Sequence, residues 1–192
     1  SLDTPCCDGP NSYLVAKHTR TANIKVALSG LGGDELFAGY NKFMIYHRIM
    51  KYRGLLHIPL SVRRSLAKLI STLGPAHASG KLASLAAMEK WDLPSVYPLL
   101  RRAYGYDEID KLLVKSNHVD KVQQRLEALN SKVAWMGDFS KCTIGEMETY
   151  TRDVLLRDTD QMSMAHALEV RVPFFDYRLI EYLLSLPDHI KY

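Results

Sequence analysis

The chain has 192 residues, 47% of them hydrophobic, which suits one domain (1–192) with a full hydrophobic core. Its 25 Lys and Arg against 21 Asp and Glu give a formal net charge of +4, too small and too dispersed to indicate nucleic acid as a partner. The sequence has no apolar run of membrane-spanning length and no signal peptide, and its three cysteines fit neither a disulfide framework nor a zinc motif. We therefore expect no membrane partner and a location in the reducing cytoplasm.

The first 40 residues predict a helix, a strand and a glycine-rich turn. Residues 1–10 are typical of a loop, and a helix is predicted from Asn11 or Ser12 to about Ala22. The β-branched run Ile24–Leu28 then predicts a short buried strand. A strand needs neighbours for its backbone groups, and the following sequence offers none that we can identify. We therefore expect disorder near this strand or self-association through its exposed edge.

Almost everything after residue 33 has the periodicity of helices. A first long helix is predicted over Asp34–Lys51, and a second over Ser61–Leu73 has Val62, Leu66, Leu69, Ile70 and Leu73 on one face. Further helices are predicted over Lys81–Lys90, Pro94–Tyr104, Asp107–Lys115, Val119–Leu129 and Thr143–Arg157. Asp176 is expected to cap a last helix that ends before Pro187. The predicted fold is mainly α, with an α/β remnant over 1–40, a helical part over 41–192 and one or two parallel strands.

The turn after the predicted strand is the best candidate for a ligand site. It reads SGLGGDELFAGY at 29–40, so that a strand, glycines and a helix N-terminus follow one another, as in phosphate sites of α/β proteins. If phosphate binds there, a divalent cation would have to lie between it and Asp34. The alternative is that residues 29–33 are only a tight connection and that Asp34 caps the helix. Spacing alone leaves both interpretations open.

Two motifs resemble those of the glutamine-dependent asparagine synthetase family. The turn at 29–40 is similar to the family's second nucleotide-site motif, and LRDTDQMSMAHALEVRVPFFD at 156–176 is similar to its other signature. They stand in the family's order, after a similar lead-in over Tyr13–Lys25. The resemblance covers nearly the whole chain, although 54–141 is matched only by its helical character. It implies the helical C-terminal part of an adenine-nucleotide α-hydrolase-like synthetase domain.

The resemblance implies an ATP-dependent carbon–nitrogen ligase with ATP and Mg²⁺ as cofactors. Such a domain adenylates the side-chain carboxylate of aspartate and releases pyrophosphate, and ammonia derived from glutamine then displaces AMP to give asparagine. Ser29 and Gly30 would contact the adenylate, and Gly32 and Gly33 would shape the turn. Asp34 would hold the magnesium ion that bridges the phosphates.

The second motif contributes further candidate residues, and one residue of the glycine turn differs from the family's usual one. Arg157 is best suited to reach a phosphate, because its planar fork matches that group. Glu169 and Arg171 are expected to pair and fix a turn between two helices, and His166 is expected to be a hydrogen-bonded packing residue. Leu31 stands where many family members have glutamate. A leucine can neither accept a proton nor bind an amine, so no catalytic residue is predicted.

Some parts of the family's machinery do not occur in these residues. These are the primary Ser-Gly-Gly-x-Asp-Ser ATP loop, the N-terminal cysteine with its glutaminase domain, and the catalytic lysine expected after Tyr192. We therefore expect a fragment of the synthetase domain that is inactive when isolated. The alternatives are a family amidotransferase that acts on another carboxylate, and a helical scaffold that has lost catalysis.

Overall fold

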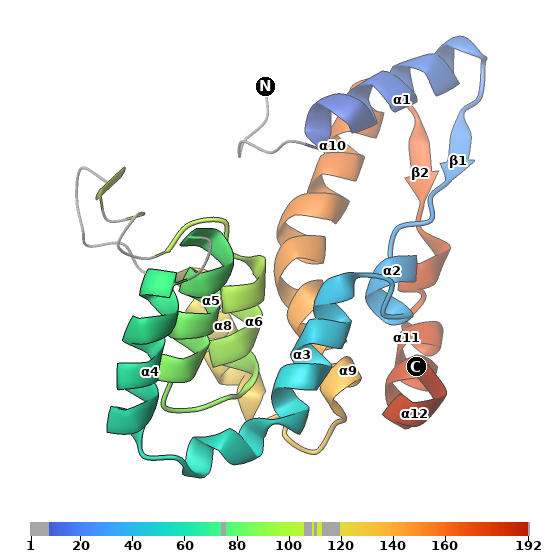
Figure 1. Cartoon of the computed structure of the whole chain (residues 1–192). Coiled ribbons are helices and arrows are strands. Elements are labelled where there is room, and N and C mark those ends of the chain that lie inside the picture. Colours follow the sequence, from blue (N-terminus) through green and yellow to red (C-terminus); the bar gives the residue numbers. More distant parts are fainter. Residues whose placement is uncertain (1–7, 74–75, 106–108, 110, 113–119, 192) are drawn as a thin grey trace. The chain divides into compact units, whose positions relative to one another are not determined.

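The computed structural model describes residues 8–73, 76–105, 109, 111–112 and 120–191 (Figure 1). The fold is mainly helical with two parallel strands, as the sequence predicted. It divides into unit 1, residues 1–40 and 143–192, and unit 2, residues 41–142. Within the described ranges, no helix is long and apolar enough to cross a membrane. Most of the predicted helix Asp107–Lys115 lies outside the described residues.

Unit 1 contains the sheet, which pairs a strand near the N-terminus with a strand in the last quarter of the chain. Helix α1 (Gly9–Thr21) leads to strand β1 (Val26–Leu28), which pairs in parallel with β2 (Glu169–Arg171) (Figure 1). The expectation that the first strand lacks a neighbour is therefore wrong. So is the expectation of a turn between two helices at 169–171, because these residues form β2. Association through the other edge of β1 stays a prediction.

A long helical run precedes β2. It consists of α9 (Asp138–Glu146), the π-helix η2 (Met147–Leu156) and α10 (Arg157–Met164). The run extends beyond the predicted Thr143–Arg157 at both ends. Helix α10 packs against α1 and β2, so residues 143–192, which the sequence assigned to the helical part, belong with the strands of unit 1.

The chain after β2 forms a short 3₁₀ turn, η3 (Pro173–Phe175), and the helices α11 (Tyr177–Ser185) and α12 (Asp188–Lys191). Asp176 caps α11 as predicted, because its Oδ1 accepts a hydrogen bond from the backbone N–H of Arg178 at 2.9 Å. Hydrogen bonds from the Arg178 side chain and backbone lower the pKa of Asp176 to about 2. The cap therefore stays charged in all but strongly acidic solution.

The predicted helix Asp34–Lys51 is two helices. Helix α2 (Gly33–Leu36) has a single turn, and α3 (Asn41–Lys51) begins after a break. Within the break, Ala38 has φ +56°, and the N–H of Gly39 donates to the carbonyl oxygen of Asp34 at 2.9 Å. A left-handed residue cannot continue an α-helix, so the chain changes direction there.

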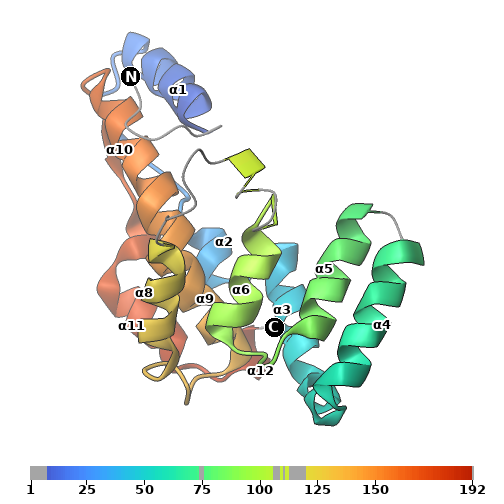
Figure 2. The same ribbon diagram turned by 90° about the vertical axis from the view of Figure 1, so that its left-hand side faces the viewer.

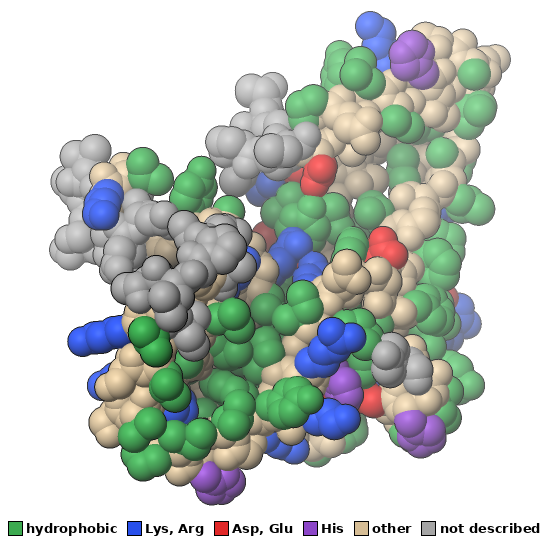
Figure 3. Space-filling model, viewed as in Figure 1, with side chains coloured by type: hydrophobic (Ala, Val, Ile, Leu, Met, Phe, Trp, Pro, Cys, Tyr) green, Lys and Arg blue, Asp and Glu red, His purple; other side chains and the backbone are tan. Residues whose placement is uncertain are grey.

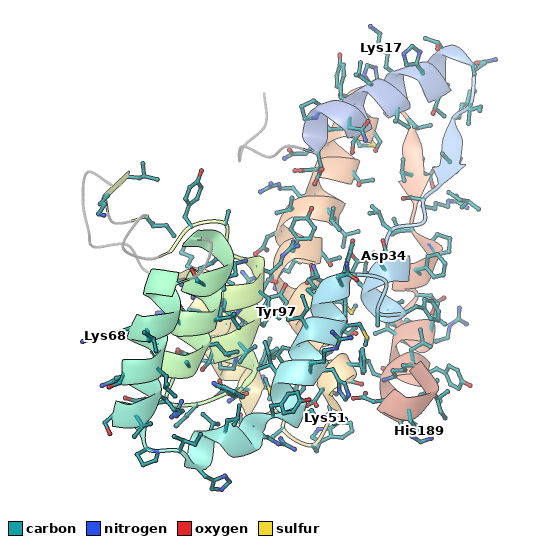
Figure 4. The ribbon with its side chains drawn as sticks, viewed as in Figure 1. Lys17, Asp34, Lys51, Lys68, Tyr97 and His189 are labelled. Carbon is teal, nitrogen blue, oxygen red and sulfur yellow. The ribbon has the colours of Figure 1, made fainter. Side chains whose placement is uncertain are left out.

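The regular elements of unit 2 are all helices in its described residues. It contains α3, the 3₁₀ turn η1 (Arg53–His57), α4 (Leu60–Leu73), α5 (Ala76–Ala87), α6 (Leu93–Arg101) and α8 (Lys121–Asn130). Helices α4 and α5 lie side by side in Figures 1 and 2, and α6 packs against α3, α5 and α8. Phe43, Tyr97 (labelled in Figure 4) and Leu126 are fully buried in its core. These helices confirm four of the helical segments predicted in this range, with shifted ends.

Candidate functional site

Strand β1 leads directly into the glycine turn. The backbone N–H of Ser29 donates to the carbonyl oxygen of Arg171 at 2.8 Å, which extends the strand pairing by one residue. The Ser29 hydroxyl accepts from the N–H of Leu31 at 3.3 Å, and the N–H of Gly33 donates to the carbonyl oxygen of Gly30 at 3.2 Å. These bonds close a tight turn at the carboxyl ends of two parallel strands, where α/β proteins commonly bind ligands.

Two glycines of the turn have contrasting surroundings. Gly32 has φ +95°, and a Cβ added there would lie 2.9 Å from Cβ of Phe174 and 3.0 Å from the ring of Phe175. The second motif therefore packs directly on the first, and this position requires glycine. At Gly30 no atom lies within 4 Å of an added Cβ. Gly30 thus borders open space, which leaves its backbone accessible to a ligand.

A buried carboxylate, Glu35, holds the turn in place. Its side chain is 1% exposed, its Oε2 accepts from the N–H of Gly32 at 3.1 Å, and its Oε1 accepts from the hydroxyl of Tyr40 at 2.9 Å. Burial and the hydrogen bond to Glu35 raise the pKa of Tyr40, so this hydroxyl keeps its proton and remains a donor. The hydroxyl of Thr143 donates to the Glu35 carbonyl oxygen at 2.9 Å. We did not predict this role, although the spacing Gly32-x-x-Glu35 matches the glutamate half of a capping box.

Because α2 has only one turn, no long helix begins at the glycine turn. A helix dipole strong enough to attract a phosphate requires several aligned peptide units, so α2 contributes little of it. Backbone N–H groups and cations would have to supply the attraction for a phosphate. The glycine turn itself is present as predicted.

Asp34 lies on α2 with its side chain exposed (Figure 4). It does not occupy the capping position of α2, which belongs to Gly32. Its carboxylate lies so close to Gly39 that a side chain at Gly39 would collide with it. Among the described residues, no three His, Cys, Asp or Glu side chains could together hold a metal ion. A single exposed carboxylate fits magnesium where phosphate oxygens and water supply the other ligands.

A cavity of about 390 Å³ lies beside the turn in unit 1. It is bordered by α1, by β1 with the turn, by α10, and by the segment that contains Leu168 and Val170. Six side chains around it carry a hydroxyl or amide group: Asn11, Ser12, Thr19, Ser29, Thr159 and Ser163. None of the described lining residues has an ionisable side chain. The cavity therefore suits an uncharged group with hydrogen-bonding edges better than a bare triphosphate.

The cavity contains only some of the predicted site residues. Ser29 and Gly30 border it, and so does Leu31, where many family members have glutamate. Gly32 and Gly33 lie in the turn against Phe174. Asp34 and Arg157 do not border the cavity. The structure thus brings together the residues proposed to contact the adenylate, but not those proposed to meet phosphate and metal.

Arg157 is engaged with its neighbour. Its Nη2 lies 3.1 Å from Oδ1 of Asp158, whose side chain is fully buried. The other carboxylate oxygen of Asp158 has no hydrogen-bond partner among the described residues. An unpaired oxygen on a buried carboxylate is costly, so the pairing with Arg157 is important for the start of α10. A role for Arg157 toward phosphate stays a prediction.

The other residues of the second motif serve the structure. Glu169 Oε1 accepts from Nε of Arg171 at 2.8 Å, which confirms the predicted pair, here on the surface of β2. His166 packs against Tyr13 with 4.3 Å between the ring centroids. Its Nε2 is buried and has no hydrogen-bond partner in the part of the chain that the structure describes. His166 is thus a packing residue, as predicted, but its Nε2 has no hydrogen bond to any described residue.

Two parallel strands, a glycine turn at their carboxyl ends and a cavity beside that turn define an α/β protein with a candidate ligand site. The chain belongs to the asparagine synthase family, because the family model described as asparagine synthase matches residues 2–192. Its domain accordingly has the adenine-nucleotide α-hydrolase-like fold that the resemblance implied.

Several curated proteins are similar to this chain. Asparagine synthetase (glutamine-hydrolyzing) 1 of Bacillus subtilis strain 168 is 28% identical over 181 residues, which are 93% of this chain and 27% of that protein. A putative asparagine synthetase (glutamine-hydrolyzing) of Mycobacterium bovis is 29% identical over 196 residues, 99% of this chain and 28% of that protein. The chain therefore spans about a quarter of the length of these relatives. No solved structure matches this chain.

Proposed function

We propose that this chain is part of an ATP-dependent asparagine synthetase that works in the cytoplasm. An oxygen of the aspartate side-chain carboxylate attacks the α-phosphorus of ATP, and pyrophosphate leaves. Ammonia derived from glutamine attacks the activated acyl carbon and loses a proton, and AMP leaves with the electron pair of the cleaved C–O bond. Membership of the asparagine synthase family supports the reaction class, and the cavity beside Ser29 and Gly30 supports a nucleotide site.

Each residue of the turn has a distinct role in this proposal. Ser29 and Gly30 contact the nucleoside part of the adenylate, because they border an uncharged cavity of suitable polarity. Glu35 holds the N–H of Gly32, and thereby the shape of the turn. Asp34 would hold magnesium, which neutralises charge on the phosphates when it is bound. Arg157 would reach the phosphates if its guanidinium also serves a second acceptor besides Asp158.

A second candidate function follows from Leu31. This leucine borders the cavity and cannot act as an acid or a base. A family amidotransferase whose acceptor is a carboxylate other than that of free aspartate would fit it. Comparing free aspartate with peptide- and sugar-linked carboxylates as substrates of the complete polypeptide separates the two. A catalytically inactive helical scaffold is the outcome in which none of them is turned over.

The proposed nucleotide site is tested by Gly30→Val in the complete polypeptide that contains these residues. A Cβ added at Gly30 meets no protein atom within 4 Å, so we expect the variant to fold normally but to obstruct the ligand. We expect at least a tenfold loss of MgATP affinity by titration calorimetry. Gly54→Val is the matched control, because Gly54 also has open space around an added Cβ and does not border the cavity. Undiminished ATP binding by Gly30→Val would mean that the nucleotide does not bind at this turn.

The isolated 192-residue chain is expected to release neither AMP nor pyrophosphate from ATP, magnesium and aspartate. The reason is that the primary ATP loop of the family does not occur in its sequence. A coupled pyrophosphate assay measures this directly. Steady release at a rate proportional to the chain concentration would refute the expectation and would mean that the turn alone supports adenylation.

A further inference from the structure

Charge is distributed unevenly along this chain. Residues 41–90 contain nine Lys and Arg but only one acidic residue, Glu89, so their formal net charge is +8, compared with +4 for the whole chain. All ten of these charged side chains belong to described residues, and six of the nine basic ones are exposed. Glu89 lies 3.7 Å from Arg64 in an exposed pair. This part of unit 2 is therefore strongly basic, although the composition of the whole chain conceals it.

Arg63 fixes which face of α4 is turned outward. It is buried, and its Nε donates to the carbonyl oxygen of Ile58 at 3.0 Å. Its Nη1 donates to the carbonyl oxygens of Ala86 at 3.0 Å and Met88 at 2.6 Å, at the end of α5. Ala67, one turn further along α4, is buried as well. Because Arg63 and Ala67 hold this side against α5, α4 cannot rotate to bury its other side.

One exposed face of α4 is aliphatic. Val62, Leu66 and Leu69 recur at the helical spacing, and their exposed fractions are 48%, 48% and 55%. Leu55 in η1 and Leu82 in α5 are similarly exposed. The sequence predicted this apolar face but not that it is open to solvent. On the side of unit 2 seen in Figure 3, hydrophobic and basic side chains lie next to one another.

We propose that the face of unit 2 that carries Val62, Leu66 and Leu69 binds the surface of an anionic lipid membrane, with α4 lying in the interface. This departs from the expectation of no membrane partner, which rested on the lack of a membrane-spanning run. A helix with aliphatic residues on one face and basic residues on the other lies in such a surface, where lipid covers the apolar face and the anionic headgroups attract the bases. On α4 the bases are Arg64 and Lys68, and Lys68 points away from the helix pair in Figure 4. Nucleic acid would use the bases but would leave the aliphatic residues exposed.

The proposal is tested by sedimenting the complete polypeptide that contains these residues with vesicles. We expect at least tenfold stronger binding to an equimolar mixture of phosphatidylglycerol and phosphatidylcholine than to phosphatidylcholine alone, and a loss of binding in high salt. The double variant Arg64→Gln, Lys68→Gln should bind roughly 30-fold more weakly, because each charge near such a surface changes binding about fivefold. Equal binding to both kinds of vesicle, or to neither, would overturn the proposal.

A second pair of variants separates the membrane from an acidic protein or polyanion. Leu66→Ser with Leu69→Ser should reduce vesicle binding by roughly tenfold or more, because lipid would bury both side chains. The control, Leu14→Ser with Ile190→Ser, changes two similarly exposed residues of unit 1 and should bind as the parent does. Thermal unfolding should be little changed in both, since all four side chains are exposed. Parent-like binding by the α4 variant, or an equal loss in the control, would refute a role for the apolar face.

Discussion

Glu35→Ala is expected to lower the free energy of unfolding by about 3 kcal/mol and to release the glycine turn. The substitution removes the acceptor of the Gly32 N–H and of the Tyr40 hydroxyl. It also leaves a cavity, because the Glu35 side chain is fully buried. Urea unfolding followed by circular dichroism gives the change in stability. Hydrogen exchange over residues 29–40 should accelerate more than exchange elsewhere in unit 1.

Glu35→Gln is the matched control for the alanine variant. A glutamine fills the same space, its amide oxygen can accept from the Gly32 N–H, and its NH₂ group can donate to the Tyr40 oxygen if that hydroxyl rotates. We expect it to recover more than half of the stability that alanine loses. Tyr40→Phe removes one hydrogen bond and should cost about 1–2 kcal/mol. If alanine and glutamine were equally destabilising, the negative charge and not the hydrogen-bond geometry would be what the turn requires.

The helices of this fold were predictable because their signals are local. Asp176 caps α11 through a hydrogen bond to Arg178, two residues away in the sequence. Strand β2 lacks such a signal, because it has three residues and two of them, Glu169 and Arg171, are charged and exposed. Its partner β1 lies near the other end of the chain, and no local pattern reports so distant a pairing. The break at Ala38 was missed for a related reason: alanine favours helix, and here the surrounding turn forces it into the left-handed region.

The apolar face of α4 shows the limit of periodicity as evidence. Spacing correctly placed Val62, Leu66 and Leu69 on one face, but periodicity cannot tell which face packs against a neighbour. Arg63 determines which face of α4 packs against α5. Its three acceptors are carbonyl oxygens of residues near α4 and at the end of α5. A charged residue at that position would ordinarily be assigned to solvent.

Only those residues of the candidate site that lie in one continuous segment of the sequence were predictable. Ser29 and Gly30 were identified because a strand, glycines and a helix follow one another in the sequence, and both residues border the cavity. Asn11, Thr159 and Ser163 border it only because α1 packs on α10, and that contact has no signature in the sequence. Glu35 was overlooked for another reason. Its exposed neighbour Asp34 has the residue type expected of a metal ligand, whereas the signal for Glu35 is only its spacing to Gly32, which matches the glutamate half of a capping box.

Gly32→Ala is the other substitution expected to have a large effect, about 3 kcal/mol of lost stability. At φ +95° any side chain costs about 1–2 kcal/mol of backbone strain. The added methyl would also lie 2.9 Å from Cβ of Phe174, which cannot move away without its own backbone. Urea unfolding of the two proteins side by side measures the difference. A change below about 1 kcal/mol would mean that η3 shifts easily and that the packing between the two motifs is loose.

Gly30→Ala and Phe175→Leu separate the two contributions at Gly32. An alanine at Gly30 meets no atom within 4 Å, and Gly30 does not have a positive φ, so its stability should change by less than about 0.5 kcal/mol. In a Gly32→Ala background, Phe175→Leu removes the ring contact at 3.0 Å but leaves Cβ of Phe174 and the backbone strain. It should therefore recover only a minor part of the loss. Full recovery would mean that the aromatic ring, and not the left-handed backbone, makes glycine necessary at this position.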